Sequence, residues 1–281
     1  MSRKLAWLSE LAVKGITFFS NNRQKRRTLA RLINKFSEDH LSTIDCPTGQ
    51  IKINHLRSPH VASAAENFFK DEPETLKWID TFKEGQIFFD VGAGIGVYSL
   101  YAALIPSVQV YSFEPNGMSF GLLVEHIRVN GMSKKISPFC IALGKKIEKE
   151  CLLFNQALEG AGGSSFGTEF YRRHGRDTEP SFSQAILSFS LDGFLEIFSI
   201  NPPDHIKIDV DGLEPEILYG ARFALSHAES IMLEVENRTP DQVKSDIELP
   251  LKRLGFEESL EFKDFGSGRN RLFRKRDLRV I

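Results

Sequence analysis

Apolar and polar positions alternate along this chain in two ways, as short apolar runs of strand length and as longer stretches with helical spacing. Residues 86–91 form the first strand candidate, and a glycine-rich turn joins them to a helix candidate at 97–104. Residues 108–113 and 117–129 repeat this order, and residues 136–143 predict a third strand. Strands that alternate with helices predict parallel βαβ units, and therefore a doubly wound α/β sheet.

The alternation is interrupted between residues 145 and 203 and then resumes. Within the interruption we predict two strands, joined by a Gly- and Ser-rich segment and a charged loop that contains Arg172, Arg173, His174 and Arg176. Long loops in compact domains are often functional, so we predict a lid that contacts substrate; a solvated loop is the alternative. The remaining elements predicted are strands at 150–155, 185–191, 205–212 and 230–235, helices at 213–225 and 240–254, and a closing hairpin from 257–262 and 272–274.

The first 45 residues differ in charge from the rest, and we predict a basic helical extension at 1–45 before a domain at 46–281. Residues 1–40 hold nine Lys or Arg against three acids, a net of +6, whereas the whole chain has −1. This extension either packs on the domain or a partner chain, or lies on an anionic membrane surface. It is too short and too charged to span a bilayer and lacks a signal-peptide pattern, so we predict a cytoplasmic protein. Residues 41–59 predict a small antiparallel pair, and residues 72–79 a helix.

The glycine-rich turn, DVGAGIG at residues 90–96, is the strongest candidate for a ligand site. Its backbone N–H groups and the following helix N-terminus would face one ligand. Gly92, Gly94 and Gly96 are spaced G-x-G-x-G, and Val97 stands where a dinucleotide fingerprint has its third glycine. Asp90 suits an ammonium group better than a pyrophosphate. The pattern favours S-adenosylmethionine over a dinucleotide; a purely structural turn and a nucleotide-dependent oxidoreductase are the alternatives.

Two further strands are predicted to end in carboxylates at the same edge of the sheet. Glu114 follows the strand at 108–113 and can accept hydrogen bonds from both hydroxyls of a ribose; a helix-capping acid is the alternative. Lys207, Asp209 and Asp211 follow one another at alternate positions in the strand at 205–212. Lys207 and Asp209 share a face, which predicts either a partly buried ion pair or a site beside the reacting groups.

The chain resembles the FkbM family of S-adenosylmethionine-dependent methyltransferases over roughly residues 72–236. The residues that carry the resemblance are DVGAGIG at 90–96, FEPN at 113–116, ALG at 142–144, GGSS at 162–165, SLD at 190–192 and KIDVDGLE at 207–214. The resemblance implies a class I methyltransferase fold with a seven-stranded mixed sheet, and methylation of a hydroxyl on a sugar, a polyketide or another small molecule. Gly94 stands where the family commonly has Asn, and Asp211 where it commonly has Glu.

The resemblance also implies roles for individual residues. Residues 90–96, including Ala93 and Ile95, would hold the methionine part of the cofactor. Apart from the resemblance, the helix at 72–79 leads directly into the strand at 86–91, so we predict that its face covers that end. Glu114 would bind the ribose, and the adenine would lie against Pro115, Asn116 and the backbone of Ala142. Asp209 is our first candidate for the general base and Asp211 the second, with Lys207 keeping Asp209 ionised.

Other classes of function are less favoured by the sequence. We predict no metal site, although Glu236 could join Asp209 and Asp211 around a divalent ion. The net charge of −1 indicates no nucleic-acid partner, and three scattered cysteines indicate neither a disulfide framework nor a metal cluster. The partner expected is a small-molecule or glycan acceptor. A binding protein that keeps the fold but has lost catalysis remains an alternative.

Overall fold

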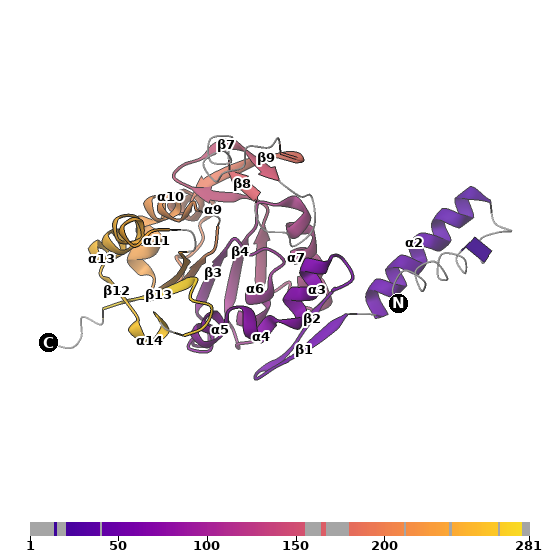
Figure 1. Cartoon of the computed structure of the whole chain (residues 1–281), viewed down its shortest axis with the longest axis horizontal. Helices are drawn as coiled ribbons and strands as arrows, with labels where there is room; N and C mark the ends of the chain where they lie inside the picture. Colours follow the sequence, from indigo (N-terminus) through magenta and orange to yellow (C-terminus); the bar gives the residue numbers. More distant parts are fainter. Residues whose placement is uncertain are drawn as a thin grey trace.

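The computed structural model describes residues 14–15, 21–39, 41–154, 164–166, 180–210, 212–235, 238–263 and 265–276. A seven-stranded sheet forms the centre of the domain (Figure 1). Its strand order is β12 (Phe256–Glu258), β13 (Asn270–Lys275), β11 (Ser230–Glu234), β10 (His205–Ile208), β3 (Ile87–Val91), β4 (Gln109–Phe113) and β5 (Ile136–Phe139).

The sheet is mixed because only β13 reverses direction. The pairs β11–β10, β10–β3, β3–β4 and β4–β5 are parallel, whereas β13 is antiparallel to both β11 and β12. Apolar side chains fill both faces of the central strands, as a sheet covered on two sides requires. The predicted seven-stranded mixed sheet is therefore confirmed.

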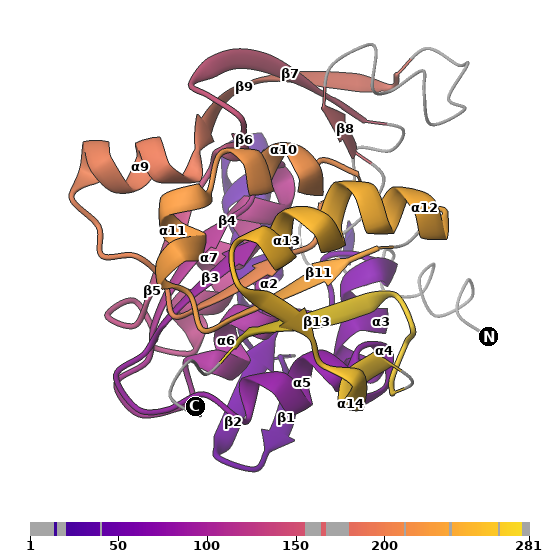
Figure 2. The same cartoon turned by 90° about the vertical axis from the view of Figure 1, so that its left-hand side faces the viewer.

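Helices cover both faces of this sheet (Figure 2). One apolar cluster joins it to α3, α4, α5, α6 and α7, and a second joins it to α9, α10, α11, η1 and α13. The helices of the first face are α3 (Pro59–Glu66), α4 (Phe68–Asp71), α5 (Pro73–Ile79), α6 (Val97–Ala102) and α7 (Gly117–Val129). Those of the second are α9 (Leu191–Phe198), α10 (Glu214–Tyr219), α11 (Arg222–His227), α12 (Pro240–Val243), the π-helical η1 (Lys244–Glu248) and α13 (Leu249–Arg253).

The strand predicted at 136–143 is wrong, because the chain changes sheets within it. β5 ends at Phe139 as the edge strand of the large sheet, a position that tolerates Pro138. β6 (Ala142–Gly144) then pairs in parallel with β9 (Phe182–Ser190), which is antiparallel to β7 (Glu148–Phe154). With β8 (Ser164–Phe166) these strands form a four-stranded sheet beyond the main one (Figure 2). The segment predicted as a lid, residues 145–203, thus contains β7, β8 and β9 of this sheet. Its predicted charged loop, with Arg172, Arg173, His174 and Arg176, lies outside the described residues.

Three other predicted boundaries differ from the structure. The helix predicted at 213–225 is divided between α10 and α11, which meet at Gly220 and Ala221. A Cβ on Gly220 would lie 2.2 Å from the carbonyl oxygen of Gly144, so this break allows close approach to β6. The predicted closing hairpin keeps β12 and β13, but α14 (Leu260–Lys263) occupies the end of its first strand. The strand at 205–212 ends at Ile208.

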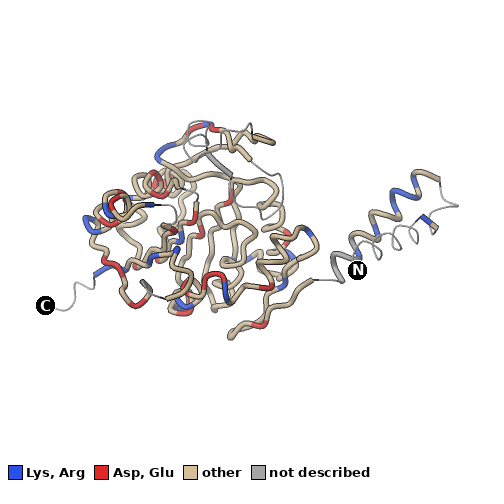
Figure 3. The backbone as a smooth tube through the Cα atoms, viewed as in Figure 1, with Lys and Arg blue, Asp and Glu red and all other residues tan. Residues whose placement is uncertain are grey.

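The N-terminal part contains a hairpin and one separate helix. β1 (Ser42–Cys46) and β2 (Gly49–Ile53) form the predicted antiparallel pair, and Ile51 and Ile53 are fully buried in the core of the domain. The predicted boundary at residue 45 thus falls within this hairpin. α2 (Asn22–Asp39) projects away from the sheet and its helices (Figure 1) and carries basic residues along its length (Figure 3). Among the described helices, none combines the length and apolar character needed to cross a membrane.

Candidate active site

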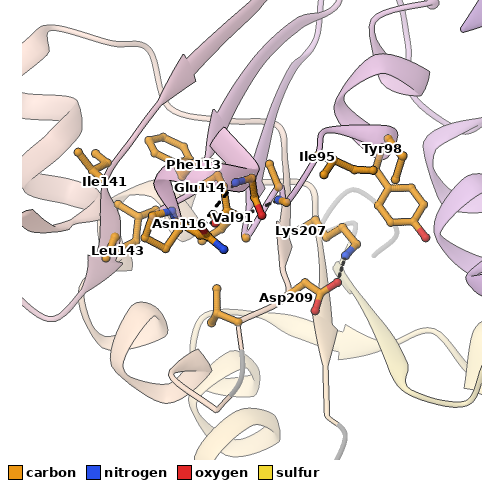
Figure 4. Close-up of a pocket in the computed structure, with 18 of the residues that line it drawn as sticks. Val91, Ile95, Tyr98, Phe113, Glu114, Asn116, Ile141, Leu143, Lys207 and Asp209 are labelled. Carbon is orange, nitrogen blue, oxygen red and sulfur yellow. Dashed lines mark hydrogen bonds and ion pairs between the residues drawn. The ribbon is translucent and has the colours of Figure 1, made fainter. Parts of the chain in front are cut away.

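A cavity of about 320 Å³ lies at the carboxyl ends of β3, β4 and β10 (Figure 4). Hydrogen bonds join the loops that follow these strands. The amides of Gly92 and Ala93 donate to the carbonyl of Phe113 over 2.9 and 3.1 Å, and the amide of Asp209 donates to the carbonyl of Val91 over 2.9 Å. The predicted meeting of these strand ends is therefore confirmed, as expected at a topological switch point.

The three glycines of the first loop all have positive φ, but they serve different purposes. A Cβ on Gly92 would lie 1.9 Å from the carbonyl oxygen of Asp209, so this glycine permits the loops to meet. A Cβ on Gly96 would lie 2.3 Å from Cδ1 of Leu123, so this one permits α7 to approach. A Cβ on Gly94 would meet no atom within 4 Å. Only Gly94 therefore leaves open space where a ligand can approach the backbone.

The loop residues divide between the cavity wall and the layer beneath it. Gly92, Ala93, Gly94 and Ile95 line the cavity, whereas Gly96 does not. Gly96 instead faces Leu123 of α7 and permits a close contact between this loop and that helix. The absence of a glycine at position 97 is thus compatible with tight helix packing in this chain.

Asp90 lies beneath the loop and does not line the cavity. It is 1% exposed and accepts a hydrogen bond of 2.5 Å from Ser99 Oγ, while its Oδ1 has no partner. Burial raises the pKa of Asp90 to about 6, against the opposing effects of Lys207 and Ser99. Direct contact with a ligand ammonium, as predicted from the sequence, does not follow from this position. The carboxylate instead contributes negative potential under the loop.

Glu114 stands at the cavity wall with its carboxylate tied to two backbone amides. It accepts hydrogen bonds from Gly94 N over 2.7 Å and from Asn116 N over 2.8 Å. Burial raises the pKa of Glu114 to about 7, and the two amides oppose this rise. Each carboxylate oxygen keeps a further lone pair, so the group can still accept ligand hydroxyls.

The neighbouring predicted residues also line the cavity, in different ways. Asn116 caps α7, where its Oδ1 accepts a hydrogen bond from Met118 N over 3.0 Å. This oxygen of its side chain is therefore already used in the cap. Pro115 and Ala142 lie on the same wall. The residue that caps α7 is therefore Asn116 and not Glu114. Glu114 lines the cavity, and its contact with a ribose stays a prediction.

Apolar side chains complete this end of the cavity. Phe113, Ile141, Leu143 and Leu152 line it and together offer surfaces for a flat ring. Leu152 belongs to β7, so the small sheet contributes to the wall. A buried carboxylate beside an apolar slot fits a nucleoside-like group, with hydroxyls toward Glu114.

Lys207 and Asp209 occupy the other end of the cavity (Figure 4). The Lys207 side chain is 2% exposed, and its ammonium contacts Asp209 Oδ2 and lies 3.5 Å from Glu72 Oε2. It also lies 4.8 Å from the centre of the Tyr98 ring. These neighbours raise the pKa of Lys207 despite its burial, and Lys207 lowers the pKa of Asp209 against the effect of burial. The pair is thus ionised, with Asp209 on the cavity wall.

Glu234 and Glu72 are parts of this cluster that the sequence did not identify. Ile208 of β10 lies beside Leu233 of β11, so the next residues, Asp209 and Glu234, are neighbours. Their carboxyl groups hydrogen-bond to each other. Burial and then the Asp209 charge raise the pKa of Glu234 to about 9. The signal for this pair in the sequence is an acid at the end of each of two adjacent parallel strands. From the sequence we select Glu236, and not Glu234, as the acid that ends the second strand.

The helix predicted at 72–79 to cover the methionine end of the ligand does not line the cavity. Within the described residues, the helical contacts at this end come from His60 and Ala64 of α3 and from Val97 and Tyr98 of α6. α5 instead buries Leu76, Trp78 and Ile79 in the core. It contributes through Glu72, the residue before its first turn, which reaches Lys207.

The second predicted base and the predicted metal alternative cannot be located in this structure. Asp211 and Glu236 lie outside the described residues, so their roles stay predictions. Among the described residues, no group of three or more His, Cys, Asp or Glu side chains is arranged to hold a metal ion.

The sheet, the glycine loop and the carboxylates around one cavity are those of a class I methyltransferase, a Rossmann-like fold. Residues 90–258, more than half of the chain, match the methyltransferase FkbM domain. The protein therefore belongs to the FkbM methyltransferase family.

A curated relative and two solved structures show what the chain is similar to. It is 25% identical over 157 residues to the hexuronic acid methyltransferase AglP of Haloferax volcanii, and the match spans 56% of this chain and 59% of that relative. The crystal structure of methyltransferase FkbM from Methylobacillus flagellatus matches with a TM-score of 0.48 and 16% identity, over 78% of this chain and 56% of that one. Precorrin-6y C5,15-methyltransferase from Geobacter metallireducens matches with a TM-score of 0.41 and 17% identity, over 72% and 83% of the two chains.

Proposed function

We propose that this methyltransferase uses S-adenosylmethionine to methylate a hydroxyl group on a sugar, a glycan or another small molecule. The observation that carries the proposal is one cavity with Gly94 and Glu114 at one end and Asp209 at the other. When bound, the cofactor supplies an electrophilic methyl group on a sulfonium. The similarity to a hexuronic acid methyltransferase supports a sugar acceptor.

The residues at the nucleoside end have roles that follow from their positions. Glu114 accepts the ribose hydroxyls while Gly94 N and Asn116 N hold its carboxylate in place. Ile141, Leu143 and Leu152 cover the adenine, with Ala142 at its border. Gly94 leaves room for the chain that links the nucleoside to the amino acid part. These contacts position the donor toward Lys207 and Asp209.

Asp209 is the general base in this proposal. Methyl transfer to oxygen is an in-line displacement, so much of the catalysis comes from alignment in a cavity that excludes water. Lys207 keeps Asp209 ionised by lowering its pKa. A carboxylate of low pKa is a weak base, so Asp209 first accepts a hydrogen bond that orients the acceptor hydroxyl. It takes the proton only as the new C–O bond forms and the hydroxyl becomes acidic.

Calorimetric titration with S-adenosylmethionine, beside NAD, tests the cofactor. We expect saturable binding of S-adenosylmethionine alone. Gly94→Val should abolish it, because the valine side chain enters the ligand space from a backbone with positive φ. Glu114→Ala should weaken it at least tenfold (about 1.4 kcal/mol), because the ribose hydroxyls lose their acceptor.

Gly131→Val provides a matched control for Gly94→Val. Gly131 also has positive φ and open space around its Cβ, but it follows α7 and is not among the residues that line the cavity. Equal loss of binding in the two glycine variants would attribute the effect to instability. No binding by a folded wild-type protein would reject the proposed cofactor, and binding of NAD would favour the oxidoreductase alternative.

A further inference from the structure

Glu234 and Asp209 form a carboxyl pair that requires a shared proton. They are adjacent at the ends of parallel strands β11 and β10 and are hydrogen-bonded to each other. Two ionised carboxylates have only acceptors, so one partner must be protonated for this bond to exist. The location of that proton decides what the pair can do.

The surrounding charges place the proton on Glu234. Lys207 contacts Asp209 directly, and its other acidic partner is Glu72, 3.5 Å away. Arg269, before β13, lies 3.9 Å from Glu72 and also favours the ionised form of Asp209. Across β13, the residue opposite Glu234 is the uncharged Asn270. Asp209 therefore has the Lys207 ammonium in direct contact, whereas Glu234 is hydrogen-bonded to the Asp209 carboxyl. Lys207 also lowers the pKa of Glu234, but by less than Asp209 raises it.

Building on the proposed methyl transfer, we propose that Glu234 is a positioning residue whose protonated carboxyl donates a hydrogen bond to Asp209 and so fixes the base toward the acceptor hydroxyl. Lys207 and Glu234 then hold Asp209 from two sides, one by charge and one by a neutral donor. The acceptor O–H bond and the donor S–CH₃ bond break as the O–CH₃ bond forms; the S–CH₃ electron pair stays on sulfur, which leaves as a neutral thioether. The acceptor proton passes to Asp209, which returns it to solvent after product leaves. No other oxidant, reductant or proton source is required.

The pH dependence of kcat in three proteins tests this role. In the wild type, kcat should fall as the pH passes about 9, where Glu234 ionises and the hydrogen bond is lost. Glu234→Gln keeps a donor at every pH, so that fall should disappear. Glu234→Ala should lower kcat at least tenfold at neutral pH with little change in KM, and Glu234→Gln should restore most of the loss. An identical alkaline fall in Glu234→Gln, or wild-type kcat in Glu234→Ala, would overturn the role.

A second measurement keeps this inference separate from the proposed reaction. Carboxyl ¹³C NMR of the ligand-free protein should show one signal that titrates near pH 9 and is missing from Glu234→Gln. If that signal is present but the protein turns over no acceptor, the proposed function is contradicted. The shared proton between Asp209 and Glu234 would still be supported. If every Glu signal that Glu234→Gln removes titrates below pH 6, the shared proton is rejected.

Independently of the active site, α2 combines many basic residues with exposed apolar side chains. Six basic residues lie on it, and its acids, Glu38 and Asp39, come only at its end. Leu29 and Ile33 are one helical turn apart and 37% and 63% exposed. Basic residues are spread along the helix where it projects from the domain (Figure 3), and they are Arg23, Lys25, Arg26, Arg27, Arg31 and Lys35.

We infer that α2 lies on the surface of an anionic lipid bilayer. Its cations match lipid phosphates, and its exposed Leu29 and Ile33 can enter the boundary between headgroups and acyl chains. A nucleic acid would use the cations but not the apolar pair. Because the helix points away from the domain (Figure 1), its exposed side chains are available to such a surface.

Flotation of the full chain with vesicles tests this inference. The protein should float with vesicles of phosphatidylcholine and phosphatidylglycerol, not with phosphatidylcholine alone, and added salt should weaken the binding. The triple variant Arg26→Glu, Arg27→Glu, Arg31→Glu should lose at least tenfold in affinity, and Leu29→Ser with Ile33→Ser should also weaken it. Lys252→Glu with Arg253→Glu, a charge reversal on exposed residues of α13, should bind as the wild type does.

Three results would overturn membrane binding by α2. One is no flotation of the wild type with either vesicle. Another is binding that the α2 variants leave unchanged. A third is a stable dimer in solution that the Leu29 and Ile33 variant dissociates, because this would assign the apolar pair to a second copy of the chain.

Discussion

Asp209→Asn is expected to lower kcat by roughly 10²- to 10⁴-fold, the range typical for loss of a general base. The substitution preserves the shape of the side chain and removes the negative charge that receives the acceptor proton. Affinity for S-adenosylmethionine should change little, because the residues proposed to hold the nucleoside lie at the other end of the cavity. Single-turnover rates and calorimetry on the same preparations separate these two effects.

A matched control is available in another aspartate. Asp192 of α9 accepts hydrogen bonds from Phe223 N over 2.9 Å and Ala224 N over 3.0 Å, and it lies away from the cavity lining. Asp192→Asn should therefore lower the melting temperature and leave kcat unchanged. Full turnover in Asp209→Asn would mean that Asp209 is not the base. Cofactor binding without turnover in the wild type, across a broad acceptor screen, would favour a catalytically inactive binding protein.

Lys207→Met is expected to destabilise the protein by about 3–5 kcal/mol at neutral pH, because it leaves buried negative charge without its cation. The Lys207 side chain is 2% exposed, and its ammonium contacts Asp209 and lies 3.5 Å from Glu72 Oε2. Methionine has a similar length and no charge, so the loss measures the electrostatic interaction more than packing. Lys145→Met is the control, since Lys145 forms an exposed pair with Glu216 and should cost less than about 1 kcal/mol.

The pH dependence of this effect follows from the directions of the two pKa shifts. Folding raises the pKa of Lys207, so its stabilisation is complete below the unfolded value of about 10.4 and fades as pH rises through the folded value. Folding lowers the pKa of Asp209, so its stabilisation is present above about 3.9 and is lost as pH falls through the folded value. The difference between wild type and Lys207→Met should be largest between these limits and shrink in acid.

Urea unfolding at neutral pH and in acid measures this difference. A loss of less than about 1 kcal/mol at neutral pH would show that water or another cation replaces Lys207. A difference that does not shrink in acid would show that packing, and not the Lys207–Asp209 pair, accounts for the loss. Combining Lys207→Met with Asp209→Asn should recover part of the stability, because the buried carboxylate is then also removed.

The order of elements and the position of the site could be predicted from local patterns in the sequence. Strand-length apolar runs, the turn at residues 90–96 and the carboxylates that follow strands are features of neighbouring residues. Parallel connections then bring Glu114 and Asp209 to one edge of the sheet. The same reasoning placed Lys207 and Asp209 in an ion pair, and the structure confirms that pair.

The tertiary structure alone decided which of these residues face the cavity and which partners they have. Asp90 is buried under the loop, and Gly92 and Gly96 make close contacts with Asp209 and Leu123, which are distant in sequence. The Asp209–Glu234 pair depends on the register of β10 against β11, and a shift of one residue would separate it. The sequence by itself determined the fold class and the candidate groups; long-range packing determined which of these groups line the cavity and in which direction their pKa values shift.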